Sequence, residues 1–222
     1  MPAITVSREY GSGGSRIAQE AAKALGYHFV DKITIEEIVR QYGLAYFDED
    51  YVALPGFWDQ FTARGERRSY MMDILRRVTN AIAHHGNVVM LGRGCYGALA
   101  GFADVLNVRI QAPLPVRIKW AVENENFADA ESAEAFVKET EAVRASFVKD
   151  CYGLPLNDAG LFELVIGTDK VPAEMATRWL VEAASALASR GGGAERTTAS
   201  LQVDPVIARV VSGVLECGLA HR

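Results

Sequence analysis

After two residues the chain runs Ala3-Ile4-Thr5-Val6-Ser7-Arg8-Glu9-Tyr10-Gly11-Ser12-Gly13-Gly14-Ser15. Its beginning is a short apolar, β-branched run that predicts a buried strand. A glycine-rich turn follows, and apolar residues then recur at helical spacing from Ile17 to Leu25. A strand, a glycine turn and a helix in succession make an anion site, because the N–H groups of the turn point inward and the helix N-terminus adds positive potential. The stretch therefore predicts a phosphate loop, and the competing interpretation is a plain strand-to-helix turn.

The standard phosphate-loop signature, G-x-x-x-x-G-K-[ST], spans Arg8 to Ser15 when it is laid over this stretch. Gly13 and Ser15 match, whereas Arg8 stands at the first glycine and Gly14 stands at the lysine. That lysine normally reaches the β- and γ-phosphates and stabilises the transferred charge. Arg8 and Arg16 flank the loop and are the nearest residues that could replace its charge.

The rest of the chain alternates between strand and helix patterns. Strands are predicted at 27–30, 87–91, 105–111 and 164–166, and helices at about 33–42, 70–85, 116–124, 132–151, 173–188 and 205–215. The mixed segment 46–68 is interpreted as a mobile or substrate-covering segment. Alternating elements favour a parallel sheet covered by helices on both faces. Ligands bind beyond the carboxyl ends of such strands, so we expect Arg8, Gly11 and Arg93 at one edge.

Bulk properties exclude several classes of protein. Half of the residues are hydrophobic, which is enough for a sizeable core. No apolar run is long enough to cross a bilayer, and the N-terminus lacks the pattern of a signal peptide, so we expect a cytoplasmic protein without a membrane partner. The formal net charge of −5 argues against nucleic acid as a partner. The cysteines and histidines lack metal-site spacing, and buried thiols are expected at Cys95, Cys151 and Cys217.

Several runs, in order, resemble the cytidylate kinase-like family. The run from Ile4 to Gly14 resembles the family's I-S-R-x-[FY]-G-S-G-G. Residues 27–32 resemble the family's F-Y-D-K segment, and residues 88–94 resemble its V-[IV]-x-G-R-G strand and turn. Residues 106–117 resemble its next strand and the start of the following helix. Residues 141–153 resemble its arginine-containing lid, and residues 161–169 resemble its L-[YF]-[DE]-L-V-I-x-T-D strand. The matches cover roughly residues 3 to 187. Two departures are Ser15-Arg16, where the family usually has Arg directly after Gly-Gly, and Gly94, where the better-known cytidylate kinases have Asp.

The resemblance implies a P-loop NTPase fold of the nucleoside-monophosphate-kinase (NMP-kinase-like) α/β type, with a parallel sheet, helices on both faces and a helical lid. The expected domain is 1–190, with the lid at about 120–155, and 191–222 is a linker and C-terminal helical tail. The implied activity is ATP-dependent phosphorylation of a nucleoside monophosphate, cytidylate first, with Mg²⁺. The missing lysine motivates a second hypothesis, a catalytically weak nucleotide-binding regulator or sensor. A small-molecule kinase with a non-nucleotide acceptor is a third.

The donor side of the predicted site is the loop itself. The backbone N–H groups of Gly11, Ser12, Gly13, Gly14 and Ser15 are expected to hold the phosphates of ATP, and Arg16, which flanks the loop, is expected to add positive charge on the same side. The Ser15 hydroxyl is placed to bind Mg²⁺, and its alternative role is an ordinary helix N-cap.

The acceptor side is predicted to involve Asp31, Arg93 and Arg117. Arg93 follows a buried strand between two glycines, which an anionic ligand explains better than solvation does. Asp31 either orients the acceptor or its metal, or caps the next helix. Arg117 either faces the nucleotide or extends along the surface beside Trp120.

The predicted catalytic residues are Arg8, Arg144 and Lys149. Arg144 and Lys149 lie in the segment that resembles the family's lid, and their alternative is a solvated helix face with Arg144 paired to Glu141 or Thr140. Arg8 is the best candidate to replace the loop lysine. Its alternative role is to hold the loop by pairing with Glu9 or Asp31. The tail packs either on the core or on a partner subunit of a homo-oligomer.

Overall fold

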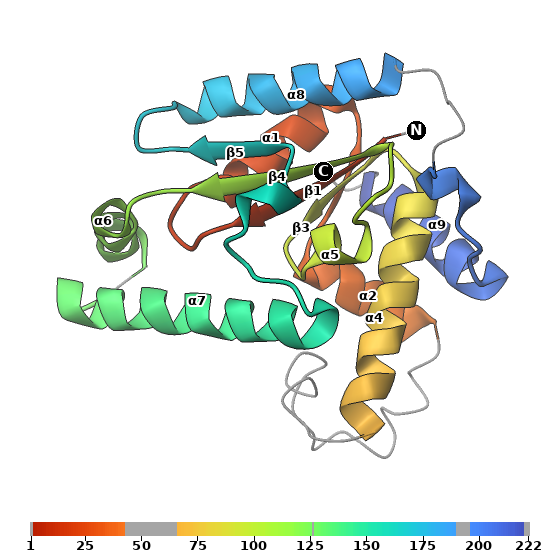
Figure 1. Ribbon diagram of the computed structural model, residues 1–222, viewed down its shortest axis with the longest axis horizontal. Coiled ribbons are helices and arrows are strands. Elements are labelled where there is room, and N and C mark those ends of the chain that lie inside the picture. Colours follow the sequence, from red (N-terminus) through yellow and green to blue (C-terminus); the bar gives the residue numbers. More distant parts are fainter. Residues whose placement is uncertain (1, 43–65, 126, 190–195, 220–222) are drawn as a thin grey trace.

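The computed structural model describes residues 2–42, 66–125, 127–189 and 196–219 (Figure 1). Within these ranges five strands form one sheet in the order β2-β3-β1-β4-β5, and every neighbouring pair is parallel. The strands are β1 (Ala3–Arg8), β2 (His28–Val30), β3 (Val88–Leu91), β4 (Val105–Gln111) and β5 (Leu164–Gly167). The predicted parallel α/β sheet is confirmed, and β1 lies at its centre.

Helices cover both faces of the sheet (Figure 1). On one face α1 (Gly14–Leu25) and α8 (Ala173–Ser189) pack over Ile4, Val6 and Val89. On the other face a second apolar cluster includes Ala3, Val88 and residues of α2 (Lys32–Gln41), α4 (Glu66–His85), α5 (Cys95–Ala98) and α9 (Pro205–Leu219). Successive strand residues thus enter opposite cores, as expected for parallel strands buried on both sides.

The segment expected to be the lid contains the end of α6 (Leu114–Asn124) and α7 (Ala130–Tyr152), which lie beside the layered core (Figure 1). The first half of α7 packs on α6 through Ala121, Ala133 and Val137. Its last turns instead pack on the core through Val148, in a cluster with Tyr96. The helix is therefore anchored at its C-terminal end, and its N-terminal half projects over the carboxyl edge of β1.

The C-terminal helix α9 is part of the main core. Ile207, Val211 and Leu215 are buried in the same cluster as Ile38 and Leu75. Of the two alternatives for the tail, the structure shows packing on the core. Two short 3₁₀ turns complete the described elements, at Ala159–Leu161 and Thr198–Ser200.

Several details differ from the sequence predictions. Helix α5 was not predicted, because its four residues, one of them Gly97, are too few to show a helical periodicity. The prediction of buried thiols holds for Cys95 but is wrong for Cys217, which is exposed, and Cys151 is half-buried.

Of the predicted segment 46–68, residues 46–65 lie outside the part of the chain that the structure describes. No described helix is long and apolar enough to cross a membrane. The described residues contain no cluster of metal-binding side chains.

Candidate functional site

The glycine turn has the backbone geometry of a loop that wraps around a ligand. Gly11 and Gly13 both have positive φ, of 77° and 74°, which side chains rarely adopt. The loop is closed internally by Ser12, whose buried hydroxyl donates to the carbonyl of Glu9 at 2.8 Å. A Cβ added to Gly11 would lie 2.9 Å from the carbonyl oxygen of Arg117, so the loop also sits tightly against α6.

The position of the missing lysine has no room for a side chain. A Cβ added to Gly14 would lie 2.6 Å from the Cβ of Arg8 and 3.0 Å from the Cβ of Ile110. The N-cap of α1 is Gly13, so the alternative role of Ser15 as N-cap is wrong. Ser15 is exposed in the first turn of the helix, where its hydroxyl is accessible to a ligand of the loop.

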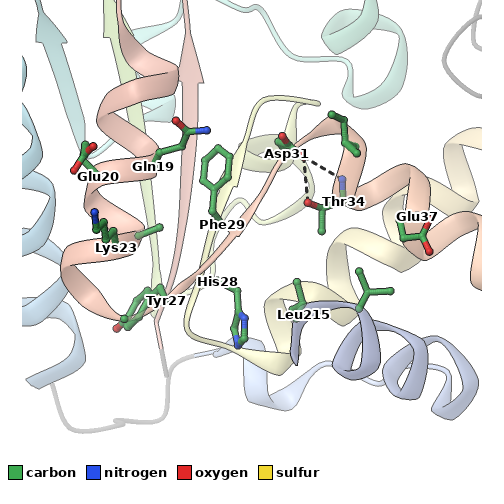
Figure 2. A pocket seen from close by; sticks show the side chains of 14 residues that line it. Gln19, Glu20, Lys23, Tyr27, His28, Phe29, Asp31, Thr34, Glu37 and Leu215 are labelled. Atoms are coloured by element: carbon green, nitrogen blue, oxygen red, sulfur yellow. Dashed lines mark hydrogen bonds between the residues drawn. The ribbon is translucent and has the colours of Figure 1, made fainter. Parts of the chain in front are cut away.

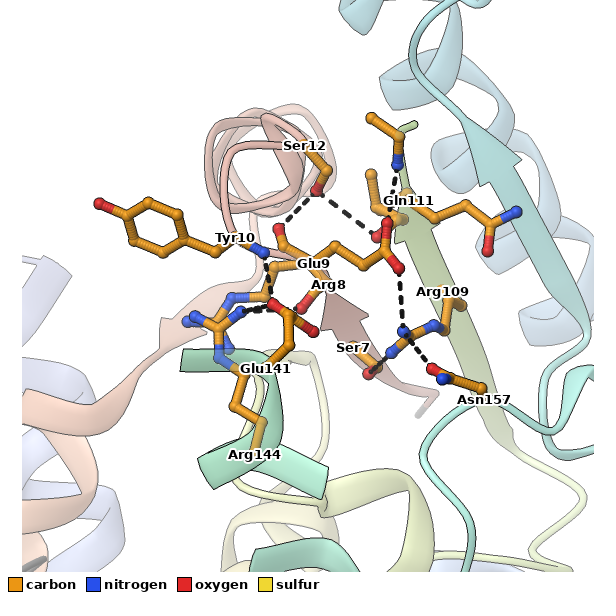
Figure 3. Close-up of polar contacts among 12 residues, drawn as sticks. Ser7, Arg8, Glu9, Tyr10, Ser12, Arg109, Gln111, Glu141, Arg144 and Asn157 are labelled. Atoms are coloured by element: carbon orange, nitrogen blue, oxygen red, sulfur yellow. Dashed lines mark hydrogen bonds and ion pairs between the residues drawn. The ribbon is translucent and has the colours of Figure 1, made fainter. Parts of the chain in front are cut away.

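The carboxylate of Glu9 connects the start of the loop to the neighbouring elements (Figure 3). It accepts a hydrogen bond from the backbone N–H of Ala112 at 3.0 Å. It also forms ion pairs with Arg117 at 3.4 Å and with Arg109 at 3.6 Å. Because Glu9 directly precedes the glycine turn, this pairing connects the loop to the end of β4 and to α6.

For Arg117 the structure excludes the surface alternative of the sequence analysis. It is buried, and its Nε donates to the carbonyl of Ala112 at 2.9 Å, so it does not extend along the surface beside Trp120. Its guanidinium is engaged by Glu9 beneath the loop. This geometry indicates a role in supporting the loop.

Arg109 belongs to the same network and was missed by sequence reasoning. Its side chain is 4% exposed, and it donates to the hydroxyl of Ser7 at 3.0 Å and to the amide oxygen of Asn157 at 2.9 Å. The signal was present, because a charged residue inside the apolar run 105–111 has to be paired. What the pattern does not show is its partner.

Three guanidinium groups converge at the carboxyl edge of the sheet. Arg8 ends β1, Arg93 follows β3, and Arg144 lies on α7. The Nη1 of Arg144 donates to the backbone carbonyl of Arg8 at 3.2 Å. The pKa of Arg8 is lowered to about 10, first by burial and then by the positive charges of Arg144 and Arg93. The pKa of Arg93 is likewise lowered to about 10, because burial and the charge of Arg144 outweigh the opposite effect of the Glu36 carboxylate.

Glu141 is the carboxylate that joins α7 to this cluster. Its Oε1 accepts from the backbone N–H of Tyr10 at 2.7 Å and from the Nη1 of Arg144 at 2.9 Å (Figure 3). The predicted alternative pairing of Arg144 with Glu141 is thus present, but not on a solvated face. Burial lowers the pKa of Arg144, against the opposing effect of Glu141.

The turn that carries Arg93 has an uncommon backbone. Gly92, Arg93 and Gly94 have consecutive positive φ angles of 77°, 55° and 65°. A non-glycine residue in this region is strained, and such strain is found mostly at functional sites. The ring of Tyr152 packs against Gly94, and its hydroxyl lies 3.5 Å from the carbonyl of Arg93. The last turn of α7 therefore helps to hold the arginine in place.

With this geometry established, comparison with known proteins identifies the family. The model of the cytidylate kinase-like family matches residues 3–170. The chain belongs to this family. It is 28% identical over 176 residues to a cytidylate kinase of Staphylothermus marinus, covering 78% of this chain and 91% of the relative. A cytidylate kinase of Methanocaldococcus jannaschii is 26% identical over 174 residues, covering 77% and 90%.

Solved structures support the fold. A Eubacterium ventriosum protein described as uncharacterized superposes with a TM-score of 0.65 at 16% identity, covering 83% of this chain and 99% of that one. The Thermus thermophilus protein TT1252 superposes with a TM-score of 0.53 at 16% identity, covering 86% and 98%. Family and fold together support a P-loop kinase that acts on nucleotides.

Not every residue expected from the family pattern lies at the arginine cluster. The side chain of Arg16 is exposed and pairs with Glu174 of α8 at 3.3 Å. Lys149 is exposed on α7. Asp31 caps α2, since its Oδ1 accepts from the backbone N–H of Thr34 at 3.0 Å and from the hydroxyl of the same residue at 3.1 Å. The capping alternative for Asp31 is therefore present in the structure.

Asp31 also lines a surface pocket of about 770 Å³ beside the edge strand β2 (Figure 2). The pocket lies between α1, α2 and α9, with Tyr27, Phe29 and Leu215 in its wall. Arg8, Arg93 and Arg144 are not among its lining residues. The positive charge of the described site is thus concentrated at the phosphate loop and not in this pocket.

Proposed function

We propose that the protein transfers a phosphoryl group from ATP to a nucleoside monophosphate, with cytidylate as the preferred acceptor. The observation that carries the proposal is the gathering of Arg8, Arg93 and Arg144 around the phosphate loop. Glu141 and Glu36 offset part of this positive charge, but the pKa values of Arg8 and Arg93 are still lowered to about 10, and a bound anion would offset the remainder. A triphosphate donor and a monophosphate acceptor, bound side by side, supply that anionic charge. Such a reaction suits the cytoplasm, where these nucleotides are available.

On the donor side, the N–H groups of the loop from Gly11 to Ser15 bind the phosphates of ATP at the N-terminus of α1. The ion pairs of Glu9 with Arg109 and Arg117 hold the loop in this shape. Mg²⁺ takes few protein ligands when it is bound to phosphates, so the accessible hydroxyl of Ser15 fits as its protein ligand. When bound, the ion neutralises charge on the phosphates during transfer.

On the acceptor side, Arg93 binds the phosphate of the nucleoside monophosphate. Arg144 approaches from the lid and contacts the transferred group between donor and acceptor. Transfer between phosphates requires positioning and charge neutralisation more than covalent catalysis, and guanidinium groups provide both. The proposal gives no role to Arg16, which pairs with Glu174, or to Lys149, because neither is among the charged groups that shift the pKa of Arg8 or Arg93.

The experiment is a panel of nucleoside monophosphates offered with ATP and Mg²⁺, with release of ADP measured by a coupled assay. We expect transfer to pyrimidine monophosphates, and to cytidylate with the highest kcat/KM. Tight ATP binding without transfer to any monophosphate would overturn the proposal and favour a regulator. Transfer only to a non-nucleotide acceptor would favour the small-molecule kinase.

A further inference from the structure

Arg8 and Gly14 occupy the first and the seventh positions of the phosphate-loop signature and lie side by side in space. A Cβ on Gly14 would lie 2.6 Å from the Cβ and 3.2 Å from the Cγ of Arg8. Real Cβ atoms essentially never show a contact as short as 2.6 Å, the 3.2 Å contact is tighter than most, and neither atom is at the flexible end of a side chain. A side chain is therefore accommodated at position 8 or at position 14, but not at both.

The side chain at position 8 reaches the place where phosphate charge is expected. Its Nη1 lies over Gly92, where any Cβ would overlap it, so the guanidinium crosses the end of β3. Arg93 and Arg144 are close enough to lower the pKa of Arg8. The group thus lies at the carboxyl edge of the sheet, between the phosphate loop and Arg93, where the terminal phosphates of a donor bound in the loop are expected.

The carboxylates that would give Arg8 a purely structural role are engaged elsewhere. Glu9 pairs with Arg109 and Arg117, and Asp31 caps α2. Glu141 acts on Arg8 only through its charge, since its hydrogen bonds go to Tyr10 and Arg144. Within the described residues the buried Nε of Arg8 has no hydrogen-bond partner. A buried donor without a partner costs free energy that a bound anion recovers.

We propose that Arg8 and Gly14 are a reciprocal exchange of the signature's first glycine and its lysine, in which the guanidinium of Arg8 contacts the terminal phosphates of the donor in place of the lysine. The inference rests on the ATP-binding half of the proposed function. In the transfer, the bond between the γ-phosphorus and the β–γ bridging oxygen breaks, and a bond from that phosphorus to an acceptor phosphate oxygen forms. ADP keeps the bridging oxygen and its electron pair, and Arg8 only donates hydrogen bonds.

The exchange can be tested because two substitutions restore the standard signature. Arg8→Gly with Gly14→Lys turns the loop into G-x-x-x-x-G-K-S. The set comprises Arg8→Gly, Gly14→Lys, this double variant, and Arg8→Gly with Gly14→Ala, which restores a Cβ without a charge. Arg178→Ala on the exposed face of α8 controls for loss of a surface arginine. Calorimetry with ATP and with ADP, without acceptor, measures the preference for the γ-phosphate, and the ADP-release assay measures turnover.

We expect Arg8→Gly to lower both turnover and the preference for ATP over ADP by at least about tenfold. A change of this size corresponds to the loss of roughly one charge-assisted hydrogen bond. The Gly14→Lys/Arg8→Gly variant should regain most of that preference, and the Gly14→Ala/Arg8→Gly variant should not. The Cβ of Ile110 would still lie 3.0 Å from a Cβ at position 14, and the alanine variant reports the cost of that contact. Gly14→Lys alone should lower the melting temperature.

Two results would overturn the exchange. One is unchanged preference for ATP over ADP in Arg8→Gly. The other is a lysine double variant that prefers ATP no more than the alanine double variant does. Absence of transfer by the wild-type protein would defeat the proposed function instead, and the comparison of ATP with ADP would remain valid.

Discussion

The backbone N–H of Tyr10, in the phosphate loop, donates a hydrogen bond of 2.7 Å to Glu141 of the lid helix (Figure 3). The ring of Tyr10 also lies edge-on to Trp120 and Phe136, with centroids 5.8 Å and 5.2 Å away. Loop and lid are therefore joined by a carboxylate and by an aromatic cluster. Helices α6 and α7 are thus in direct contact with the loop.

Substitution of Glu141 should separate these two contributions. Glu141→Gln keeps an acceptor for the Tyr10 N–H but removes the negative charge that pairs with Arg144. Arg144 should then be less well positioned, so turnover should fall while the fold is retained. Glu141→Ala removes both and should also lower the free energy of unfolding by about 1–3 kcal/mol. Urea denaturation and the ADP-release assay measure the two effects. Glu134→Ala, which breaks an exposed pair with Lys138 on the same helix, is the control. Equal effects of Glu134→Ala and Glu141→Ala would argue against the link.

Gly13 and Gly26 form a matched pair at the two ends of α1. Both have positive φ, of 74° and 66°, and in both cases an added Cβ meets nothing within 4 Å. Valine at either position should cost about 1–3 kcal/mol of stability through backbone strain. Only Gly13→Val should abolish ATP binding, because only Gly13 lies in the loop. A folded Gly13→Val protein with unchanged ATP affinity by calorimetry would refute the assignment of the loop.

Arg93→Gly should lose acceptor binding without losing stability. Glycine relieves the left-handed strain at this position, and the variant no longer buries a charge. The loss of a charge-assisted hydrogen bond, worth about 1.5–3 kcal/mol, should raise the KM for the acceptor at least about tenfold and leave ATP affinity nearly unchanged. The control is Asn87→Gly, because within the described residues Asn87 and Arg93 are the non-glycine residues with positive φ. Loss of ATP affinity with acceptor affinity retained would place Arg93 on the donor side.

Arg8→Met should stabilise the ligand-free protein at neutral pH. Burial and the neighbouring arginines lower the pKa of Arg8 from 12.5 to about 10, so the folded state disfavours the charge it carries. Removing that charge should raise the free energy of unfolding by about 1–3 kcal/mol. Between about pH 10 and 12.5 the unfolded chain binds this proton more than the folded protein does, so the free energy of unfolding of the wild type should rise with pH. The difference in free energy of unfolding between Arg8→Met and the wild type should therefore become smaller.

Urea denaturation of Arg8→Met and wild type at pH 7, 9 and 10.5 measures this difference. It should be constant up to pH 9 and smaller at pH 10.5. Inorganic pyrophosphate should raise the melting temperature of the wild type more than that of the variant, because the anion compensates for the charge that the variant lacks. A variant less stable than the wild type at pH 7, with no loss of stabilisation by pyrophosphate, would show that Arg8 is structural.

The sequence by itself determined the architecture. The strand, turn and helix around Gly11, the alternation of elements and the common edge of Arg8 and Arg93 follow from local patterns and from the geometry of parallel strands. The pairing of Arg144 with Glu141 was also accessible, because residues three apart are neighbours on a helix. These features depend on spacing along the chain, which the sequence displays directly.

Only the tertiary structure decided which distant charges meet. Glu9 pairs with Arg109 and Arg117, roughly a hundred positions away, and no local pattern distinguishes these partners from Arg16 or Lys149, which lie at the surface. The missing lysine appeared in the sequence as a loss. It becomes an exchange once the backbone places Gly14 against Arg8, because whether a side chain fits is decided by the atoms packed around it and not by its position in a motif.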